Sequence, residues 1–123
     1  MADPRSARGL HGERLAERYL RRRKLKLVAR RFHTPAGELD LVCLDGEVLV
    51  FVEVKSLSSR ALQDPHERVS SQKQQRLCRA ARAFLAQKRW SDRPCRFDVV
   101  SVLLSVSGEP QIEHFPDAFA PRW

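Results

Sequence analysis

The sequence predicts an α/β domain, in which helices cover a β-sheet on at least one side. Three observations lead to this class. Apolar residues near the start recur at helical spacing, two β-rich runs then flank Asp45-Gly46, and a second helical pattern precedes another long β-rich run. The order helix, strands, helix, strands is typical of helices packed on a sheet. The length of 123 residues fits one domain with its own core.

The first half of the chain is expected to hold one helix and three strands. Residues 1–8 are polar and charged and are expected to be a disordered lead-in, which leaves residues 9–123 as a single domain. A helix is predicted from about Leu10 to Lys24, because one apolar stripe at helical spacing contains Leu15, Ala16, Tyr19 and Leu20. Further along, the pattern predicts a short strand at 25–32, a turn at 33–37, and hairpin strands at 38–44 and 47–55.

The second half begins with a polar, serine-rich segment, residues 56–69, which is expected to be a surface loop. Ser71 and Gln74 form a candidate capping box for a second helix that runs to about Lys88. One face of that helix is apolar and contains Leu77, Cys78, Ala81, Phe84 and Leu85. The remaining pattern predicts a long strand at 96–106, a turn at 107–110, a short strand at 111–115, and an irregular tail after Pro116.

The chain is strongly basic, with 23 Lys and Arg against 15 Asp and Glu and a net charge of +8. Such an excess favours polyanionic partners, with nucleic acid first, although an anionic membrane, an acidic protein or solubility alone would also explain it. Two runs, residues 18–31 and 72–89, contain basic residues and no acidic one. Either they contact a DNA backbone or they are solvated helix faces. The candidate DNA contacts are Arg22, Arg23, Lys24, Arg30, Arg31, Arg76 and Arg79.

The cysteines and the length of the apolar runs indicate in which cellular compartment the protein is expected. Cys43, Cys78 and Cys95 are odd in number and form no C-x-x-C pair, which argues against a disulfide scaffold or a zinc site. They are expected to be small buried residues in a reducing compartment. No signal-peptide pattern and no run of membrane-spanning length is visible. The protein is therefore expected to be soluble and cytoplasmic, with no membrane partner.

The hairpin brings two carboxylates together. If Asp45-Gly46 is the turn, then Asp40 pairs with Phe51, and one strand face carries Asp40, Glu53 and Lys55. Asp40 and Glu53 are then diagonal neighbours with α-carbons roughly 7–8 Å apart. Hard cations such as Mg²⁺ use one or two protein carboxylates, and a nearby ammonium can orient a water or stabilise phosphoryl charge. The pattern therefore predicts a site for a divalent cation.

Two alternatives to this interpretation stay open. Glu-x-Lys is common on exposed strands, where the opposite charges mildly stabilise the sheet, although here it ends an almost unbroken apolar run. A turn with one residue more or fewer would move Asp40 to the opposite face.

The run GELDLV, a turn and then VFVEVK resembles the core of the PD-(D/E)XK nuclease superfamily. More closely, nearly the whole chain resembles the YraN-like family of small bacterial proteins, which are predicted endonucleases distantly related to archaeal Holliday junction resolvases. That likeness includes GLHGERLAERYL near the start, Lys73 at the head of the second helix, and RFDVVSV at 96–102. It implies a restriction-endonuclease-like core, a central mixed β-sheet flanked by helices in α-β-β-β-α-β order. Two departures are Leu57, where many relatives have arginine, and the lack of a proline before Asp40.

The resemblance also implies roles for individual residues. Asp40 and Glu53 would bind Mg²⁺ or Mn²⁺ with the main-chain carbonyl of Val54, and Lys55 would assist the attacking water. Glu13 matches a glutamate that related resolvases add from the first helix, and the helical wheel places it beside the apolar stripe, with Glu17 further toward solvent. The second-tier candidates are Gln72 and Lys73, the latter on the inward side of its helix.

Three functional hypotheses follow. The first is a metal-dependent endonuclease that acts on structured or branched DNA, as a homodimer like the resolvases that it resembles. The second is a nucleic-acid-binding module on the same fold, without turnover. The third is a protein-interaction subunit whose carboxylates are only structural. Asp98 is expected to be structural, the four histidines have no assigned role, and Trp90 and Trp123 are expected to be packing residues or edge contacts.

Overall fold

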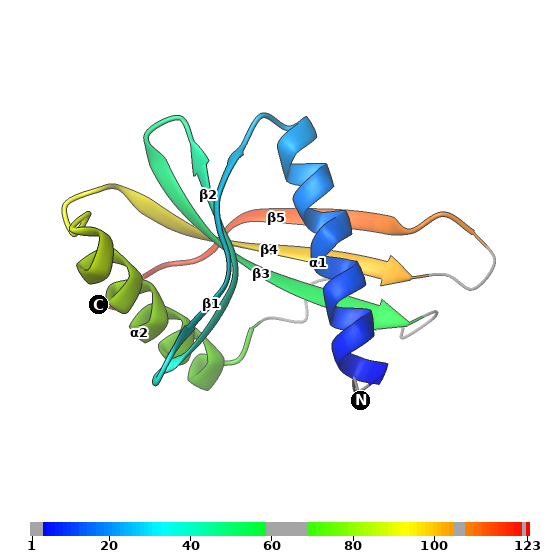
Figure 1. Ribbon diagram of the computed structural model, residues 1–123, viewed down its shortest axis with the longest axis horizontal. Coiled ribbons are helices and arrows are strands. Elements are labelled where there is room, and N and C mark those ends of the chain that lie inside the picture. The colour runs from blue at the N-terminus through cyan, green and yellow to red at the C-terminus, as the bar shows by residue number, and fades with distance from the viewer. Residues whose placement is uncertain (1–3, 59–68, 105–107, 122) are drawn as a thin grey trace.

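A computed structural model of the chain describes residues 4–58, 69–104, 108–121 and 123. Two helices and a five-stranded sheet make up this part, and the strand order in space follows the order in the chain. β3 and β4 run parallel, whereas every other neighbouring pair is antiparallel. The elements are α1 (Pro4–Arg22), β1 (Lys26–Thr34), β2 (Gly37–Asp45), β3 (Val48–Ser58), α2 (Ser71–Lys88), β4 (Cys95–Leu104) and β5 (Gln111–Phe119) (Figure 1). The predicted mixed sheet flanked by helices is therefore confirmed.

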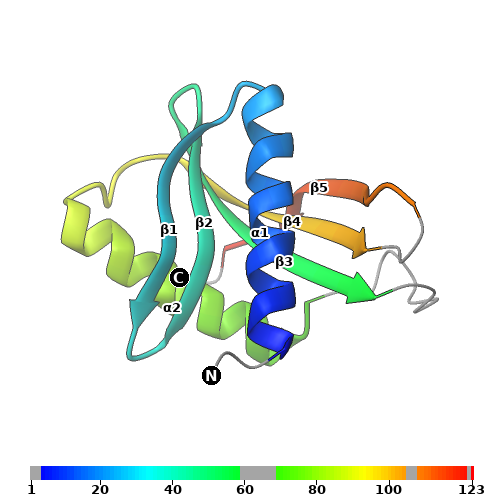
Figure 2. The ribbon, with the colours of Figure 1, turned by 45° about the vertical axis from the view of Figure 1, so that its right-hand side comes forward.

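The two helices cover opposite faces of the sheet, with α1 in front of the strands and α2 behind them in Figure 2. Ala16 and Leu20 of α1 pack on one face, over Leu41, Cys43, Val50, Val52, Val100 and Val102. Leu77, Ala81 and Phe84 of α2 pack on the other, over Val42, Leu49, Phe51, Phe97 and Val99. Parallel neighbours need a long crossover, and α2 is the helix of the β3–β4 crossover. Both faces are buried, which explains why β3 is apolar on both sides.

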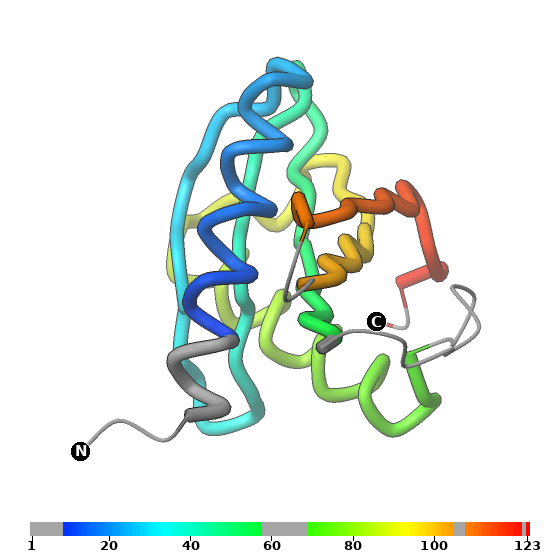
Figure 3. Tube along the Cα trace, turned by 90° about the vertical axis from the view of Figure 1, so that its right-hand side faces the viewer, coloured from blue at the N-terminus to red at the C-terminus, as the bar shows by residue number. Residues whose placement is uncertain are grey.

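The sheet is twisted, so β1 and β2 cross the direction of β3, β4 and β5 (Figure 1). Figure 3 shows α1 running alongside β1. The turn of the β1–β2 hairpin reaches α2, where Gly37 lies against Arg76. Leu39, two residues after Gly37, packs in the apolar cluster under α2. Plain alternation along residues 38–44 predicts that Leu39 shares a face with Leu41, and this expectation was wrong, because the two side chains pack in different clusters.

The β2–β3 register differs from the predicted one by two residues. Asp45 pairs with Val48 and Leu41 with Val52, so the turn is Gly46-Glu47 and not Asp45-Gly46. Gly46 has φ 61°, and a glycine with positive φ at the first central position is typical of a type II′ hairpin turn. Because the shift is even, it moves no side chain to the other face of the sheet by itself. Continuing the register by one pair sets Asp40 opposite Glu53 and not Phe51.

Several element ends also differ from prediction. α1 begins at Pro4, inside the segment expected to be a disordered lead-in, while residues 1–3 lie outside the described part. β5 continues through Pro116 to Phe119, where an irregular tail was expected, because an edge strand tolerates a residue without an N–H. β3 extends to Ser58. The rest of the expected loop, residues 59–68, and part of the expected turn, residues 105–107, lie outside the described residues.

α2 spans Ser71–Lys88, as predicted, but its cap lies one residue earlier than expected. The Ser70 side chain accepts a hydrogen bond of 3.2 Å from the Lys73 N–H. Gln74 donates from its side chain to the Val69 carbonyl at 2.9 Å. Ser70 and not Ser71 is therefore the N-cap, which satisfies one of the free N–H groups of the first turn.

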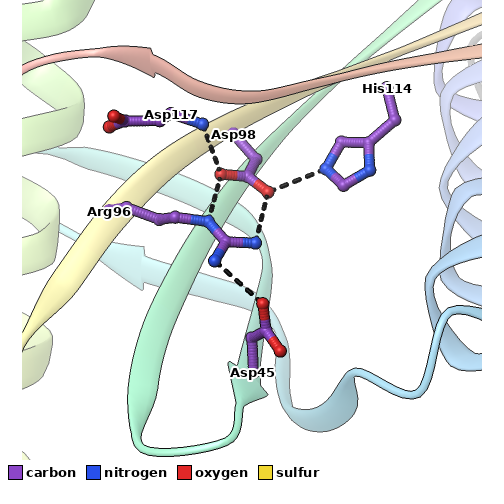
Figure 4. Close-up of polar contacts among 5 residues, drawn as sticks. All are labelled: Asp45, Arg96, Asp98, His114 and Asp117. Atoms are coloured by element: carbon purple, nitrogen blue, oxygen red, sulfur yellow. Dashed lines mark hydrogen bonds and ion pairs between the residues drawn. The ribbon is translucent and has the colours of Figure 1, made fainter.

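Asp98 ties β5 to the rest of the sheet (Figure 4). Its side chain is fully buried and accepts hydrogen bonds from Arg96 at 2.9 and 3.2 Å and from the Asp117 N–H at 3.0 Å. The Nε2 atom of His114 lies 2.7 Å from the same carboxyl group. Arg96 also reaches Asp45 at 2.9 Å. One buried carboxylate thus joins β4, β5 and the β2–β3 hairpin.

No disulfide joins the cysteines in the described part of the chain, and Cys43 and Cys78 are buried as expected, whereas Cys95 is half-buried. Within the described residues, neither helix is both long and apolar enough to cross a membrane.

Candidate metal centre

Asp40 and Glu53 meet where β2 and β3 begin to diverge. A hydrogen bond joins their carboxyl groups, and the Asp40 Oδ2 atom also accepts the Val54 N–H at 2.8 Å. The Glu53 side chain is only 9% exposed. Such a hydrogen bond needs a proton on one of the two groups, and the raised pKa of Asp40 places it there. The prediction that one face brings these two carboxylates together therefore agrees with the geometry, at closer range than expected.

This arrangement raises the pKa of Asp40 above its ordinary value. Burial is the largest cause of the raised pKa, and the negative charge of Glu53 raises the pKa further. The hydrogen bond from the Val54 N–H lowers it in part, and the pKa of Asp40 is about 8. The site thus favours a positive charge between the two oxygens. A proton supplies it in the metal-free protein, and a divalent cation could replace that proton.

Lys73 lies close to this pair. Its Nζ atom is 2.8 Å from the Glu53 Oε2 atom, although its side chain remains 46% exposed. The Ser70 cap positions the first turn of α2 at the cleft, which turns Lys73 toward β3. Gln72, the other second-tier candidate, is exposed and does not line the cleft. An exposed ammonium can leave Glu53 at little cost when a cation or a phosphate arrives.

Glu13 approaches the pair from α1. Gly12 is buried, and a methyl group there would collide with the Ser56 side chain, so the glycine lets α1 come close to β3. The charge of Glu13 contributes to the raised pKa of Asp40, but its carboxylate is held by Arg31 at 3.0 Å. Glu13 is 14% exposed and Glu17 is 13% exposed. The expectation that Glu17 lies further toward solvent was therefore wrong.

These groups line one cleft of about 300 Å³ between the hairpin and α2. Its wall contains Glu13, Gly37, Glu38, Asp40, Glu53, Val54, Lys73, Arg76 and Leu77. Glu38 was missed by the sequence interpretation, although it stands two residues before Asp40 and shares its side of the strand by simple alternation. Lys55 is half-buried on β3 opposite Ser101 and is not part of this wall.

The donor set fits one kind of ion. Within the described residues, no three His, Cys, Asp or Glu side chains converge on a common point. A structural zinc site, which needs four such ligands, does not fit. Two carboxylates in a water-accessible cleft do fit Mg²⁺ or Mn²⁺, because these hard ions keep several waters and accept one or two protein carboxylates.

The predicted DNA contacts lie in different places. Arg76 lines the cleft. Arg30 is bound by Glu17 through two hydrogen bonds of 2.7 and 2.8 Å, and Arg31 by Glu13, so both charges are partly neutralised. The remaining residues lie elsewhere. Arg22 is the last residue of α1, about 14 Å along the helix from Glu13, and Arg23 and Lys24 follow it, while Arg79 lies in a separate groove. Of the candidate DNA contacts, Arg76 alone lines the cleft.

Replacing Asp40 by asparagine is expected to raise the melting temperature of the metal-free protein. The amide oxygen can keep the Val54 N–H bond, while the amide nitrogen can donate to Glu53 without a shared proton. The folded pKa of about 8 lies above the ordinary 3.8, so the folded state binds the extra proton, and stability falls as the pH rises between those values. A gain of about 1 kcal/mol corresponds to about 4 °C in a domain of this size.

Thermal unfolding with EDTA at pH 5 and pH 8 tests this expectation, and the difference between variant and parent should be larger at pH 8. A lower melting temperature at pH 8 would instead mean that Asp40 is a structural anion. That outcome supports the protein-interaction hypothesis, because breaking a needed ion pair leaves a charge unpaired.

Comparison with known proteins gives a consistent match. A family model described as "Uncharacterised protein family UPF0102" matches residues 12–102. A UPF0102 protein of Pseudomonas aeruginosa is 43% identical over 123 residues, covering 97% of this chain and 98% of the relative. Others from Anaeromyxobacter dehalogenans and Geotalea uraniireducens are 45% and 42% identical, covering 95% and 90% of this chain and 87% of each relative. The matched segment contains every residue that lines the cleft.

Proposed function

Because this chain belongs to the uncharacterised protein family UPF0102, the YraN-like family that its sequence resembles, we propose a function from its own site. We propose that it is a metal-dependent endonuclease that hydrolyses phosphodiester bonds in structured or branched DNA. The observation that carries this proposal is the pair of hydrogen-bonded carboxyl groups, Asp40 and Glu53, in a cleft that also contains Lys73 and Arg76. Acidic oxygens for a cation beside basic groups for phosphate are what phosphodiester hydrolysis needs.

In this proposal each residue has a defined task. Asp40 and Glu53, with the Val54 carbonyl, hold Mg²⁺ or Mn²⁺, and the Val54 N–H keeps Asp40 oriented. The ion, when bound, makes water a better nucleophile and reduces the negative charge of the phosphate. Lys55 positions the attacking water. Glu13 completes the site as an acceptor next to the carboxyl pair.

The phosphate is held by α2. Lys73 exchanges its contact with Glu53 for a phosphate oxygen, and Arg76 provides a second cationic contact at the same cleft. The free N–H groups at the start of α2 add a weak favourable field for an anion. The basic net charge of +8 brings the nucleic acid to this surface from a distance.

A second candidate is a nucleic-acid-binding module without turnover. The contact of 2.8 Å between Lys73 and Glu53 favours it, because this ammonium already neutralises one of the two carboxylates. The absence of Lys55 from the cleft wall, among the residues that the structure describes, favours it as well. This candidate predicts salt-sensitive binding that does not respond to added Mg²⁺.

Cleavage of end-labelled linear, flap and four-way-junction DNA separates the two candidates. Each substrate is incubated with Mn²⁺, Mg²⁺ or EDTA, beside the Asp40→Asn variant as a matched control that keeps the fold. The nuclease proposal expects cutting that requires metal, is strongest on branched DNA and disappears in the variant. Tight, salt-dependent binding with no cutting under any metal would favour the binding module.

We further propose that the protein works as a homodimer in the cytoplasm, as the likeness to resolvases implies. Cysteines without a disulfide in the described part of the chain are compatible with a reducing compartment. Light scattering on the purified protein, with and without four-way-junction DNA, measures the stoichiometry. A monomer in both samples would contradict the dimer.

A further inference from the structure

A second basic surface lies at the other end of α2 from the cleft. It is a groove of about 590 Å³, into which Arg79, Arg82 and Arg93 project together with Trp123. Leu85 and Ala86 also line it, and among the described residues no acidic side chain does. α2 itself contains no acidic residue. The groove therefore combines concentrated positive charge with an aromatic ring.

The arginines of this groove have no acidic partner in the described part of the chain. Arg79 and Arg82 are exposed, and neither forms an ion pair within the described residues, in contrast to Arg30 and Arg31 of β1. Arg93 lies over the Trp90 ring at 4.6 Å, an arrangement that orders the guanidinium without removing its charge. Unpaired guanidinium groups in a concave surface are suited to phosphate oxygens, which they bind through two parallel hydrogen bonds.

Trp123 is the second unusual feature. Its side chain is 53% exposed, and Leu10 is the only other large apolar side chain of the described part that is exposed. Its ring lies 6.1 Å from that of Phe97, which holds it against the body of the protein. A large ring left open beside arginines offers a stacking surface for another flat ring. Nucleobases have such rings, and base stacking on aromatic side chains is a main source of affinity for single strands.

The cleft and the groove are separate, but basic residues of α2 line both of them. Lys73 and Arg76 line the cleft, while Arg79 and Arg82 line the groove, so a basic residue recurs at every third position. Lys73 and Arg82 are about 14 Å apart along the helix axis, and each step of three residues turns by about 60° around it, so these basic residues cross the exposed face of α2 from the cleft side to the groove side. A nucleic-acid strand that crosses this face would therefore contact basic side chains between the cleft and the groove that contains Trp123.

We propose that this groove binds a single-stranded stretch of nucleic acid, with its phosphates on Arg79 and Arg82 and a base stacked on Trp123. A single strand is chosen over a duplex because paired bases hide their faces inside the stack, where Trp123 cannot reach them. The inference rests on the proposed function in taking nucleic acid as the partner of the cleft. It adds that the substrate has an unpaired segment close to the bond that is cut.

Tryptophan fluorescence reads this groove directly, because the chain contains two tryptophans, Trp123 in the groove and Trp90 beneath Arg93. Titration in EDTA with an oligothymidylate of about 12 nucleotides, within the usual site sizes for single strands, should quench the emission. Trp123→Ala is expected to weaken binding about tenfold, whereas Trp123→Phe, which keeps a ring, should bind within about twofold of the parent. Binding of the variants is followed by anisotropy of a labelled oligonucleotide.

The charge contribution is tested with a double variant, Arg79→Gln with Arg82→Gln. Two lost phosphate contacts should reduce the slope of log affinity against log salt by about 1.4 for a single strand. The matched control is Arg14→Gln with Lys26→Gln, which removes two exposed basic residues outside the cleft and the groove. Melting temperatures check that all variants are folded.

Two outcomes would overturn the inference. In one, the groove variants bind the oligonucleotide no more weakly than the control pair. In the other, polyglutamate of equal charge competes as well as the oligonucleotide, which would mean that the groove binds acidic chains in general. Since the assay contains no metal, loss of the nuclease proposal leaves this result unaffected. Conversely, a negative result in the oligonucleotide-binding assay would not change the result expected from the cleavage assay on four-way junctions and flaps.

Discussion

Replacing Lys55 by alanine is expected to lower the rate of metal-dependent DNA cleavage by about 10² to 10⁴-fold, the range for a residue that assists a proton transfer. Lys55 stands two residues beyond Glu53 on the same strand and shares its face. DNA affinity should change by less than about threefold, because one cation among many contributes little to binding. Single-turnover cleavage and filter binding on the same junction DNA measure the two quantities separately.

Lys73→Ala is the matched control, since it removes the other lysine near Glu53. Its ammonium contacts Glu53 but is 46% exposed, so its loss is expected to weaken phosphate binding and to reduce the rate by about tenfold or less. Equal loss of cleavage and binding in Lys55→Ala would contradict the role of Lys55. A severe loss confined to Lys73→Ala would transfer that role to Lys73, which already lines the cleft.

Replacing Asp98 by alanine is expected to lower the free energy of unfolding by about 3–5 kcal/mol, the range for breaking a buried charge network. The buried carboxylate accepts bonds from Arg96 and from the Asp117 N–H and contacts His114. Its removal takes this partner from all three groups and leaves Arg96 with Asp45 alone. β5 should lose most, since two of these groups belong to it. Urea unfolding followed by circular dichroism gives the change in stability.

Asp45→Ala is the control for this network, because Asp45 contacts the same arginine from a side chain that is 48% exposed. An exposed pair contributes about 0–1 kcal/mol, so this variant should be nearly as stable as the parent. Asp98→Asn keeps the shape of the side chain, and its free energy of unfolding should lie between those of Asp45→Ala and Asp98→Ala. This variant can be measured even if Asp98→Ala does not fold. Similar losses for Asp45→Ala and Asp98→Ala would show that burial is not the cause.

The same carboxylate makes the protein sensitive to acid. Burial acts to raise the pKa of Asp98, but bonds from His114, Arg96 and the Asp117 N–H outweigh it and hold the pKa below its ordinary value of 3.8. The unfolded chain therefore binds this proton more readily than the folded one. The contribution of Asp98 is present in full above the unfolded pKa and is lost as the pH falls through the folded value.

Local sequence determined the elements and the faces of this protein. Alternation along residues 38–55 placed Asp40 and Glu53 on one face, and this result survived a register error because the error was an even number of residues. The apolar stripe of α2 predicted its bounds correctly, and the DG dipeptide predicted a hairpin at the right place. These features depend on neighbours within a few positions, and such patterns are visible in one chain.

Packing of distant elements decided how these side chains are paired. The turn type shifted the register by two residues, and the crossover of α2 brought Lys73 to Glu53 across 20 positions. α1 and β1 placed Glu13 against Arg31, and β5 carried His114 and Asp117 to Asp98. A charged side chain can pair with many partners of opposite sign, and sequence spacing does not rank them. Only the tertiary structure selects one, because burial makes an unpaired charge costly and so requires a definite partner.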